Sequence, residues 1–518
     1  MKRASPSPAQ PALSKGLRRY LYLTAAVTGA AIMVVEILGA KMLSPFVGLS
    51  HFVWTAQIAV TLVALACGYY AGGRLVDRSQ NLGRLYGAIL AAAGYLVLTV
   101  LICEPVANWC LDFNLAVGSL LASAALFFIP LSLLAMTGPF LVRVVTFSIA
   151  GVGGNVGRLT SIGTLGSFAG TMCIGYIMLP LLPNSISMYL TAGALTLITI
   201  GYFAFFNRKS RAPLAGAAAL VLGIGLLAGR PQTREYAHFI ERFRGNSHFG
   251  QIQVLDRRDG NLRLLSNDYL IQNTYDPVRK QSTTAFTFAL AGLARAYTTN
   301  INDVLCIGLG VGIVPMEFAR QGARVDVVEI NPAIVPVAVR FFDLDPDKLR
   351  ITIDDGRHFL NRCRKQYDTV VLDAFLGDSS PSHLMTHEAF AAIRRALRPG
   401  GTLVINALCR PEAGHDFLAA SLDKTLKSVF AGVRMYNDGD QSYFVATDHP
   451  DPEFVHPPEL DRVHPSVQTE VETTFANVVE PSPNHGQVLT DDFNPVEFYD
   501  AQNREALRRQ LVLIVRQL

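Results

Sequence analysis

The chain has 518 residues, a formal net charge of +4 and a mean hydropathy of +0.29, which is high for a soluble protein. So small a charge does not indicate a nucleic-acid partner. Long apolar runs fill residues 20–229, whereas the composition from Arg230 onward is that of an ordinary globular domain, which excludes a single soluble domain. We therefore expect an α-helical membrane domain, with lipid as its partner, followed by a soluble domain.

The apolar region divides into six spans and a shorter seventh run rich in Gly and Ala. The spans cover about residues 21–42, 53–72, 85–103, 115–136, 162–182 and 188–206, and the seventh run covers 213–229. No cleavable signal peptide is expected, because the first run is long enough to span. Positive charges crowd the N-terminal residues 1–19 and alternate loops thereafter, which predicts a basic, cytoplasmic N-terminus.

The number of spans decides the side of the soluble domain. Six spans return it to the cytoplasm, whereas seven export it. A nucleoside cosubstrate is made in the cytoplasm, so we favour a cytoplasmic soluble domain on a bacterial inner membrane.

Two features of the spans are polar or small. Glu36 lies within the first span, where a carboxylate usually faces a partner or a cavity. It is expected either to pair with Lys41 or a neighbouring helix, or to belong to a polar membrane-embedded site. Glycines on two spans predict close helix packing in preference to a transport path: Gly68, Gly72 and Gly73, and Gly163, Gly166 and Gly170.

The soluble half begins with a β-hairpin pattern and continues with alternating strands and helices. The hairpin strands are expected at 251–255 and 262–266 around a break at Asp259-Gly260, within a small β-subdomain at 230–280. A helix at 282–296 leads to strands at 304–307, 325–329, 349–353, 369–373 and 403–406, and Pro399-Gly400-Gly401 makes a turn before the last. This order predicts a doubly wound, mainly parallel α/β domain at 281–450, with a C-terminal extension at 451–518.

A glycine-rich turn follows the first of these strands. Its glycines, Gly308, Gly310 and Gly312, let a ligand approach the backbone, and Glu329, 21 residues after Gly308, can accept hydrogen bonds from ribose hydroxyls. Asp355 and Asp373 also follow strand ends, so they converge on the same crevice. Alone, this pattern would also suit a nicotinamide or flavin enzyme.

Later motifs narrow the choice. Asp354-Asp355-Gly356, the strand ending at Asp373 and the segment 397–404 together resemble the S-adenosylmethionine-dependent transferases, and within them the spermidine synthase family. The hairpin, with segments 247–254 and 268–272, and the segment 489–497 resemble its membrane-fused branch.

The resemblance implies a Rossmann-like domain that binds a nucleoside sulfonium. It places Glu329 on the ribose, Asp355 with Gly356 on the adenine, and Gln272 near the donor. Asp373 would lie beside the transferable chain, as the candidate catalytic residue. The cosubstrate would be S-adenosylmethionine or its decarboxylated form, with no metal and no other cofactor, and we leave open a homodimer.

Three positions depart from the family pattern. Val311 replaces an acid in the glycine turn, residues 281–283 replace a Tyr-His-Glu element, and Leu376 replaces a second acid, although Asp378 lies two residues on. A diamine is a dication that needs compensating acids. We therefore expect intact S-adenosylmethionine, whose own carboxylate would attack its γ-carbon, releasing methylthioadenosine and homoserine lactone, with Asp373 orienting the α-amino group.

Other functions stay open. Aminopropyl transfer to putrescine or another polyamine could use acids from elsewhere, such as Asp276, Asp378 or Asp491-Asp492. Methyl transfer is compatible with the fold, as is a non-catalytic ligand-sensing membrane protein or transporter. Asp491-Asp492 could instead cap the segment before Pro495.

The remaining candidates have bland interpretations. His383 and His387 lie four apart on an expected helix, but no third ligand accompanies them, so we expect solvent-facing or donor-contacting histidines. The segment 378–383 is either a lid or a loop in which Ser382 caps that helix. Three cysteines of the soluble half are expected to be reduced and structural: Cys306, Cys363 and Cys409.

Overall fold

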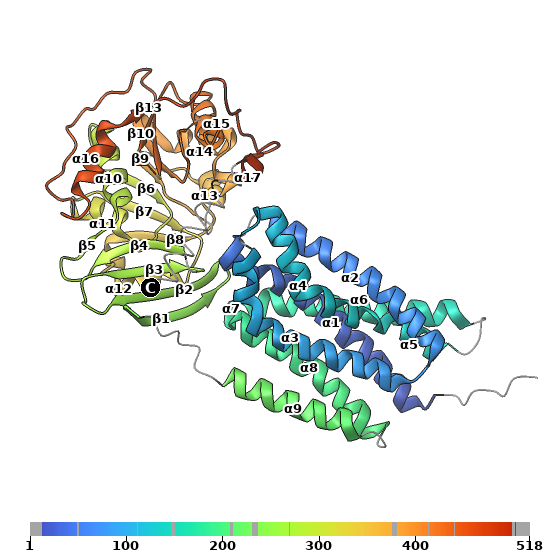
Figure 1. Cartoon of the computed structure of the whole chain (residues 1–518). Coiled ribbons are helices and arrows are strands. Elements are labelled where there is room, and N and C mark those ends of the chain that lie inside the picture. Colours follow the sequence, from blue (N-terminus) through green and yellow to red (C-terminus); the bar gives the residue numbers. More distant parts are fainter. Residues whose placement is uncertain are drawn as a thin grey trace, which may run out of the picture. The chain divides into compact units, whose positions relative to one another are not determined.

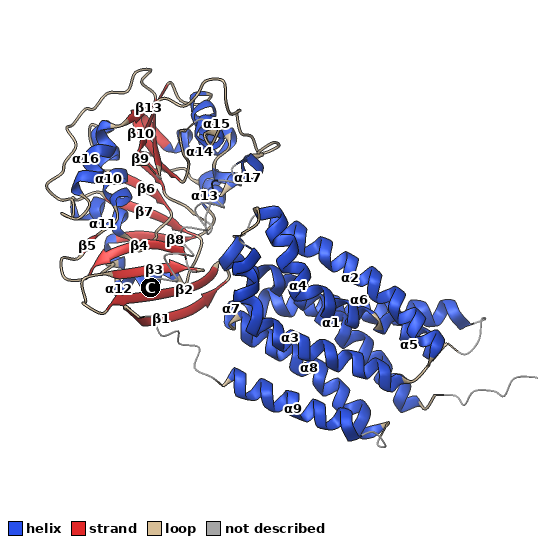
Figure 2. Cartoon of the chain, in the orientation of Figure 1, coloured by secondary structure: helices blue, strands red, loops and turns tan. Residues whose placement is uncertain are grey.

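A computed structural model of the chain describes residues 13–48, 51–110, 112–146, 151–207, 211–229, 237–268, 270–375, 381–412, 414–439, 441–499 and 503. The chain divides into two compact units, Met1–Gln232 and Thr233–Leu518. The first unit is helical and the second combines strands with helices (Figures 1 and 2).

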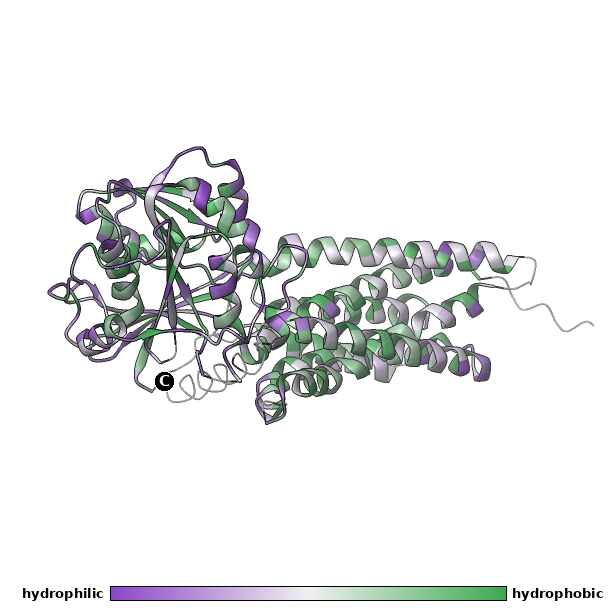
Figure 3. Cartoon of the chain, turned by 90° about the horizontal axis from the view of Figure 1, so that it is seen from above, coloured by the Kyte–Doolittle hydropathy of each residue, from purple (hydrophilic) through white to green (hydrophobic). Residues whose placement is uncertain are grey.

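The first unit, called here the membrane unit because the sequence predicts that it spans a membrane, is a bundle of apolar helices. Its elements are α1 (Lys15–Val47), α2 (His51–Arg78), α3 (Leu82–Cys110), α4 (Leu115–Ala135), α5 (Thr137–Val145), α6 (Val152–Cys173), the π-helix η2 (Ile174–Met178), α7 (Leu179–Leu181), α8 (Asn184–Phe205) and α9 (Arg211–Ala228). Hydrophobic residues predominate along these helices (Figure 3). Within the described residues, six helical runs are long and apolar enough to cross a membrane, whereas Ala212–Ala228 is shorter.

Small residues let these helices approach each other closely, as predicted. A Cβ added to Gly68 would lie 2.3 Å from the Ser132 carbonyl oxygen of α4, and one added to Gly166 would lie 2.1 Å from the Ala26 carbonyl oxygen of α1. Gly72 and Gly170 make similar contacts with Met136 and Ala30. Each backbone therefore occupies the space of a missing side chain. Gly73 has no such neighbour, so the prediction is wrong there.

The expected pairing of Glu36 with Lys41 is not found. Among the described residues Glu36 makes no ion pair, either with Lys41 or with a neighbouring helix.

The soluble unit begins with a five-stranded antiparallel sheet in sequential order. Its strands are β1 (Phe239–Ser247), β2 (Gly250–Arg257), β3 (Arg263–Asn267), β4 (Leu270–Asp276) and β5 (Gln281–Ser282). The predicted hairpin is β2–β3, and β1, β4 and β5 extend it. The β1–β2 connection turns at Gly250, whose φ is +118°, and the Asp268 carboxylate accepts a hydrogen bond from Gln251 N at 2.8 Å. This subdomain is therefore larger than a hairpin.

An eight-stranded sheet forms the rest of the unit, in the order β13-β11-β12-β10-β9-β6-β7-β8. The strands are β6 (Asp303–Ile307), β7 (Arg324–Glu329), β8 (Leu349–Ile353), β9 (Tyr367–Leu372), β10 (Leu397–Ala407), β11 (Gly432–Asn437), β12 (Ser442–Thr447) and β13 (Val478–Val479). The five predicted strands, β6 to β10, are parallel, which confirms the doubly wound α/β fold. The antiparallel strands β11 to β13 were not predicted.

Helices cover both faces of this sheet (Figure 2). They are α10 (Ala285–Tyr297), α11 (Ile313–Arg320), α12 (Ile334–Phe341), α13 (Gly356–Arg362), α14 (His387–Ala396), α15 (Phe417–Lys427), α16 (Gln468–Ala476) and α17 (Val496–Tyr499), with 3-10 turns η3 (Pro346–Lys348) and η4 (Ser382–Leu384). Alternate residues of each strand enter two cores: Val304 and Cys306 pack with α10, and Leu305 and Ile307 pack with α14.

Two local predictions are corrected. Strand β10 begins at Leu397, so Pro399-Gly400-Gly401 lies within it and not in a turn before it; the pairing with β9 shifts register between Leu397 and Thr402. Ser382 does not cap the following helix. Thr386 does so, because its Oγ1 accepts a hydrogen bond from Ala389 N at 3.2 Å.

A buried carboxylate at the amino end of β6 forms several ion pairs. They lie at the edge of the sheet opposite the predicted site. The Asp303 side chain is 2% exposed and pairs with Arg324 at 2.7 Å, Arg398 at 2.7 Å and Lys365 at 3.1 Å. These cations, Arg324 foremost, hold the pKa of Asp303 well below its usual range. The Asp303 side chain thereby links β6 to the three segments that carry Arg324, Lys365 and Arg398.

Asp303→Asn should lower the free energy of unfolding by about 3 kcal/mol at neutral pH, because it leaves the cations without their shared anion. Since the folded pKa is lowered, the contribution of Asp303 is present above about pH 4 and is lost as the pH falls below that value. Chemical denaturation at several pH values measures both effects. Asp259→Asn, at an exposed pair with Arg257, is the control and should leave stability nearly unchanged at every pH.

Candidate functional site

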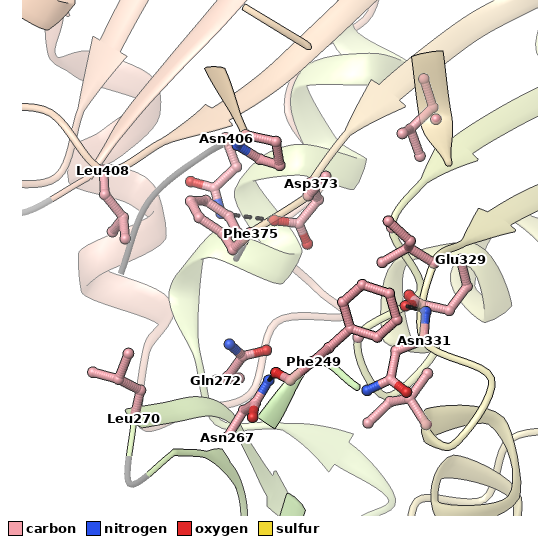
Figure 4. Close-up of a pocket in the computed structure, with 18 of the residues that line it drawn as sticks. Phe249, Asn267, Leu270, Gln272, Glu329, Asn331, Asp373, Phe375, Asn406 and Leu408 are labelled. Atoms are coloured by element: carbon pink, nitrogen blue, oxygen red, sulfur yellow. Dashed lines mark hydrogen bonds between the residues drawn. The ribbon is translucent and has the colours of Figure 1, made fainter. Parts of the chain in front are cut away.

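A cavity of about 350 Å³ opens where the strands β6, β7, β8, β9 and β10 end, and strands of the β-subdomain form its other wall. Figure 4 shows side chains from both walls pointing into it, among them Gln272, Glu329 and Asp373. This is the carboxyl edge of a doubly wound sheet, where ligands of such folds bind. Of the predicted site residues, Gly312 alone does not line it.

The glycine turn after β6 brings the backbone against the floor of the cavity. Gly308 has a φ of +101°, and a Cβ there would lie 2.1 Å from the Asp373 carbonyl oxygen. Gly310, with a φ of +53°, lies against Asn273 of β4. Gly312 instead precedes α11 with a φ of +85° and faces Leu344, so its function is to start the helix and not to line the cavity.

Glu329, the last residue of β7, is fixed by backbone donors. Its Oε2 accepts a hydrogen bond from Leu309 N at 2.9 Å, and its Oε1 accepts one from Asn331 N at 2.7 Å. Burial raises the pKa of Glu329, although these amides oppose the shift. The amides orient the carboxylate, and lone pairs on both oxygens remain for hydroxyl donors, as the ribose prediction requires.

Asp373 follows β9, and its carboxylate accepts a hydrogen bond from a residue of β10. Asn406 Nδ2 donates to Asp373 Oδ1 at 2.9 Å (Figure 4). Burial, together with the negative charge of Glu329, raises the pKa of Asp373 to about 6, although the Asn406 bond opposes this. Asn406 is 1% exposed, and its Oδ1 has no hydrogen-bond partner among the described residues. The Asp373 carboxylate and Asn406 Oδ1 can therefore both accept hydrogen bonds from a ligand in this part of the cavity.

Asp355 has less freedom than predicted. Its Oδ1 caps α13 by accepting hydrogen bonds from Arg357 N at 2.9 Å and His358 N at 3.0 Å, and its Oδ2 lies 2.9 Å from His383 Nε2. Burial raises the pKa of Asp355, but the bonds from His358 and His383 outweigh it, so the pKa lies below its usual value. An adenine amine would have to share these oxygens. Gly356 is needed for close packing, because a Cβ there would lie 2.6 Å from Ile307 Cγ2.

The two histidines are not placed as predicted. His383 lies in η4, and His387 begins α14, so they do not share a helix. His387 Nδ1 lies 2.8 Å from Ser428 Oγ, away from the cavity, whereas His383 lines it. No group of three or more His, Cys, Asp or Glu side chains positioned to hold a metal occurs in the described part of the chain.

The positions that depart from the family pattern do not supply acids to the cavity. Val311 is 1% exposed and packs in the core, and residues 281–283 are not in the cavity wall. Leu376 and Asp378 lie outside the described residues. The Asp276 carboxylate caps Val278 N and Arg279 N instead.

The Asp491-Asp492 pair does not line the cavity either. Asp491 accepts hydrogen bonds from Arg357 at 2.8 Å and Thr386 Oγ1 at 2.6 Å, so it braces the segment near Pro495. Three of the four acids suggested as substitutes are therefore absent from the wall.

Several lining residues were not predicted. Asn331, Asn406 and Arg410 lie within four residues of strand ends, so the rule that ligands bind at carboxyl ends could have identified them. Phe249 and Asn267 come from the β-subdomain, and no local pattern marks them. Cys306 and Cys409 are buried, Cys363 is partly buried, and none of these three forms a disulfide, as predicted.

Comparisons with known proteins agree with this architecture. Residues 283–438 match the family model of the spermine/spermidine synthase domain. The N-terminal histidine N-methyltransferase of Emericella nidulans is 30% identical over 220 residues, which are 38% of this chain and 38% of that protein. A probable polyamine aminopropyl transferase of Bifidobacterium longum is 27% identical over 190 residues, 36% of this chain and 42% of that protein. The chain thus spans about two fifths of the length of these relatives.

Among solved structures, a probable spermidine synthase from Corynebacterium glutamicum covers 51% of this chain and 98% of its own, with a TM-score of 0.40 and 17% identity. The matched segment 283–438 runs from the end of β5 through β11, and so contains the glycine turn and every carboxylate that lines the cavity. Residues 283–438 of the soluble unit are therefore a spermidine synthase-like domain.

Proposed function

We propose that the soluble unit binds intact S-adenosylmethionine and cleaves it into methylthioadenosine and homoserine lactone. The order of the strand ends supports this assignment. Glu329 and Asp355 lie at the β7–β8 half of the cavity, where they would bind the nucleoside. Asp373, Asn406 and Arg410 lie at the β9–β10 half, where the amino-acid part of the substrate would bind.

The main support for intact S-adenosylmethionine as the substrate is the set of charged side chains at the β9–β10 half of the cavity. Among the described residues, the ends of β9 and β10 offer the cavity one carboxylate, Asp373, and one cation, Arg410. This set matches an α-amino acid: Asp373 and Asn406 Oδ1 accept from its ammonium group, and the guanidinium of Arg410 binds its carboxylate. Among the described residues, a diamine would meet no second acid at this half of the cavity to balance its second positive charge.

The reaction needs no external nucleophile. An oxygen of the substrate carboxylate attacks the γ-carbon, the bond from that carbon to sulfur breaks, and its electron pair passes to sulfur. The sulfonium becomes the neutral thioether of methylthioadenosine, the carboxylate becomes the lactone, and no proton moves. The protein contributes mainly by holding the chain so that carboxylate and γ-carbon meet, because the sulfonium is already a good leaving group.

Product analysis tests the proposal. The purified full-length protein should convert S-adenosylmethionine alone to methylthioadenosine and homoserine lactone, detected by mass spectrometry. Arg410→Gln should reduce kcat/KM by on the order of 100-fold, through lost carboxylate binding. Arg364→Gln, an exposed arginine outside the cavity, is the control. Spermidine formed only from decarboxylated S-adenosylmethionine and putrescine would contradict the proposal and support aminopropyl transfer.

Methyl transfer is the second candidate, favoured by the name of the N-methyltransferase relative at 30% identity. It would use the same donor, with the acceptor entering beside Asp373. S-adenosylhomocysteine formed from the same incubations, in place of methylthioadenosine, would support it. If the six long spans alone cross the membrane, the catalytic unit lies on the side of the N-terminus, which we propose is the cytoplasm.

A further inference from the structure

The membrane unit holds an ionisable side chain that the proposed reaction does not use. Glu36 lies in α1, eleven residues before its end at Val47, within a run long and apolar enough to cross a membrane. Its side chain is partly buried and, among the described residues, has no cationic partner. A carboxylate within a membrane span is energetically unfavourable, and such residues commonly mark ion or substrate sites.

A second polar side chain without a partner among the described residues lies against α1 at Gly39, three residues after Glu36. Gln57 of α2 is fully buried, and neither its Oε1 nor its Nε2 has a hydrogen-bond partner among the described residues. The amide fills the gap left by Gly39 of α1, where a Cβ would lie 2.7 Å from Nε2 and 3.1 Å from Oε1. Leaving such an amide unsatisfied destabilises the folded protein. Its placement therefore indicates a partner that the described residues do not supply.

Helix geometry puts these groups at one level. Glu36 precedes Gly39 by three residues and Thr61 follows Gln57 by four, so each pair occupies one helix face. Because the consecutive helices α1 and α2 run in opposite directions (Figure 1), one turn back on α1 is level with one turn forward on α2. Thr61 is 2% exposed, and its Oγ1 also has no partner among the described residues.

Helix α6 changes form at the same level. Gly166 meets Ala26 and Gly170 meets Ala30, so α1 and α6 advance in parallel, and this spacing brings the π-helix Ile174–Met178 level with Glu36. The π-helix also contacts α1. Short π-helical turns within α-helices are frequent at functional sites. The irregular turn and the unpartnered polar atoms therefore coincide.

We propose that Glu36, Gln57 and Thr61 form a binding site for a small monovalent cation inside the membrane unit. One carboxylate balances one positive charge, and the amide and hydroxyl oxygens are neutral hard donors that complete its coordination. The same oxygens suit Na⁺ or the ammonium group of an amine. A divalent ion would lack a second compensating charge.

Tryptophan fluorescence provides a local reporter. The chain contains two tryptophans, Trp54 and Trp109, and Trp54 precedes Gln57 by three residues on α2. Full-length protein carrying Trp109→Phe would be titrated with sodium chloride and, separately, with methylammonium chloride. Choline chloride controls for ionic strength, because the quaternary ammonium is larger and has no N–H donors. A saturable change in Trp54 emission is expected with one or both small cations.

Substitutions then assign the response. Glu36→Gln should weaken binding by on the order of tenfold or more, and the isosteric Thr61→Val should weaken it less. Glu104→Gln removes an exposed carboxylate of α3 and should leave binding unchanged.

The outcomes distinguish the source of the cation. A response to sodium alone assigns the site to an alkali cation, and a response to methylammonium alone assigns it to an amine. The proposal is overturned if neither salt differs from choline chloride, or if binding is undiminished in Glu36→Gln. Should Glu36→Gln fail to fold, unchanged affinity in Thr61→Val would overturn it equally.

Discussion

Asp373→Asn should abolish methylthioadenosine formation and, at neutral pH, stabilise the folded protein. The expected loss in kcat/KM is on the order of 1,000-fold or more, because the variant keeps the shape of the side chain but cannot balance the ammonium and sulfonium charges. Asn406 already donates to Asp373 at 2.9 Å, so an amide at residue 373 can still accept that bond. The β9–β10 half of the cavity should therefore keep its structure in this variant.

The pH dependence follows from the raised pKa. Burial raises the pKa of Asp373 to about 6, so the folded state holds its proton more tightly than the unfolded state. Proton uptake at Asp373 therefore stabilises the fold below the unfolded pKa of about 4, and this contribution is lost as the pH rises through about 6. Above that pH, Asp373→Asn should be more stable than the wild type by on the order of 1–3 kcal/mol.

Denaturation curves at pH 4, 5, 6 and 7 measure this difference, which should grow up to about pH 6 and then level off. Activity of the wild type should fall as the pH drops below about 6, because the protonated carboxyl no longer attracts a cation. Asp347→Asn, in the exposed turn η3, is the control and should change neither quantity. Full activity in Asp373→Asn would show that Asp373 does not contact the charged part of the substrate.

The parallel strands were predictable because each is a local signal. The run from Val304 to Ile307 is apolar on both faces of the sheet and ends in a glycine turn, and Glu329 follows at the spacing typical of nucleoside sites. Glu329 and Asp373 were then expected to lie close together, because the carboxyl ends of parallel strands lie at the same edge of a sheet. Periodicity and topology thus specify both the sheet and half of the cavity.

The remaining wall depended on tertiary structure. Phe249 and Asn267 reach the cavity because β1 to β5 fold over the sheet edge, and no spacing in the sequence encodes that approach. The glycine Gly312 resembles Gly308 in sequence, yet it faces Leu344 and not the cavity. Asp355 also looks like a ligand residue, but its oxygens serve Arg357 N, His358 N and His383. Competing partners of this kind are invisible in a motif.

The charge of the β9–β10 half was predictable only in part. The missing acids were visible in the sequence, because Val311 stands where the family has a carboxylate. In the structure Val311 is buried and does not face the cavity. This position therefore contributes neither an acid nor any other side chain to the cavity wall. The arginine Arg410 gave no signal, since it follows β10 in a segment with no recognisable pattern.

Gly308→Ala should remove nucleoside binding, with a larger effect than a positive φ alone produces. A Cβ at this position would lie 2.1 Å from the Asp373 carbonyl oxygen and 2.8 Å from its carbonyl carbon, in a backbone conformation with φ +101°. Both main chains are held in place, since Gly308 N donates to Val328 O and Asp373 N donates to Ile307 O. Neither can retreat without breaking strand pairing, so the turn or Asp373 must move.

Gly322→Ala separates the two causes. Gly322 has a φ of +90°, and nothing lies within 4 Å of its Cβ position, so the substitution introduces only backbone strain of about 1–2 kcal/mol. Gly308→Ala adds the steric clash and should cost about 2–4 kcal/mol in unfolding free energy. Calorimetric titration with S-adenosylmethionine should give near wild-type affinity for Gly322→Ala and no measurable binding for Gly308→Ala. Equal affinities in the two variants would mean that the close approach of Gly308 to Asp373 does not shape the site, and the placement of the substrate chain beside Asp373 would have to be abandoned.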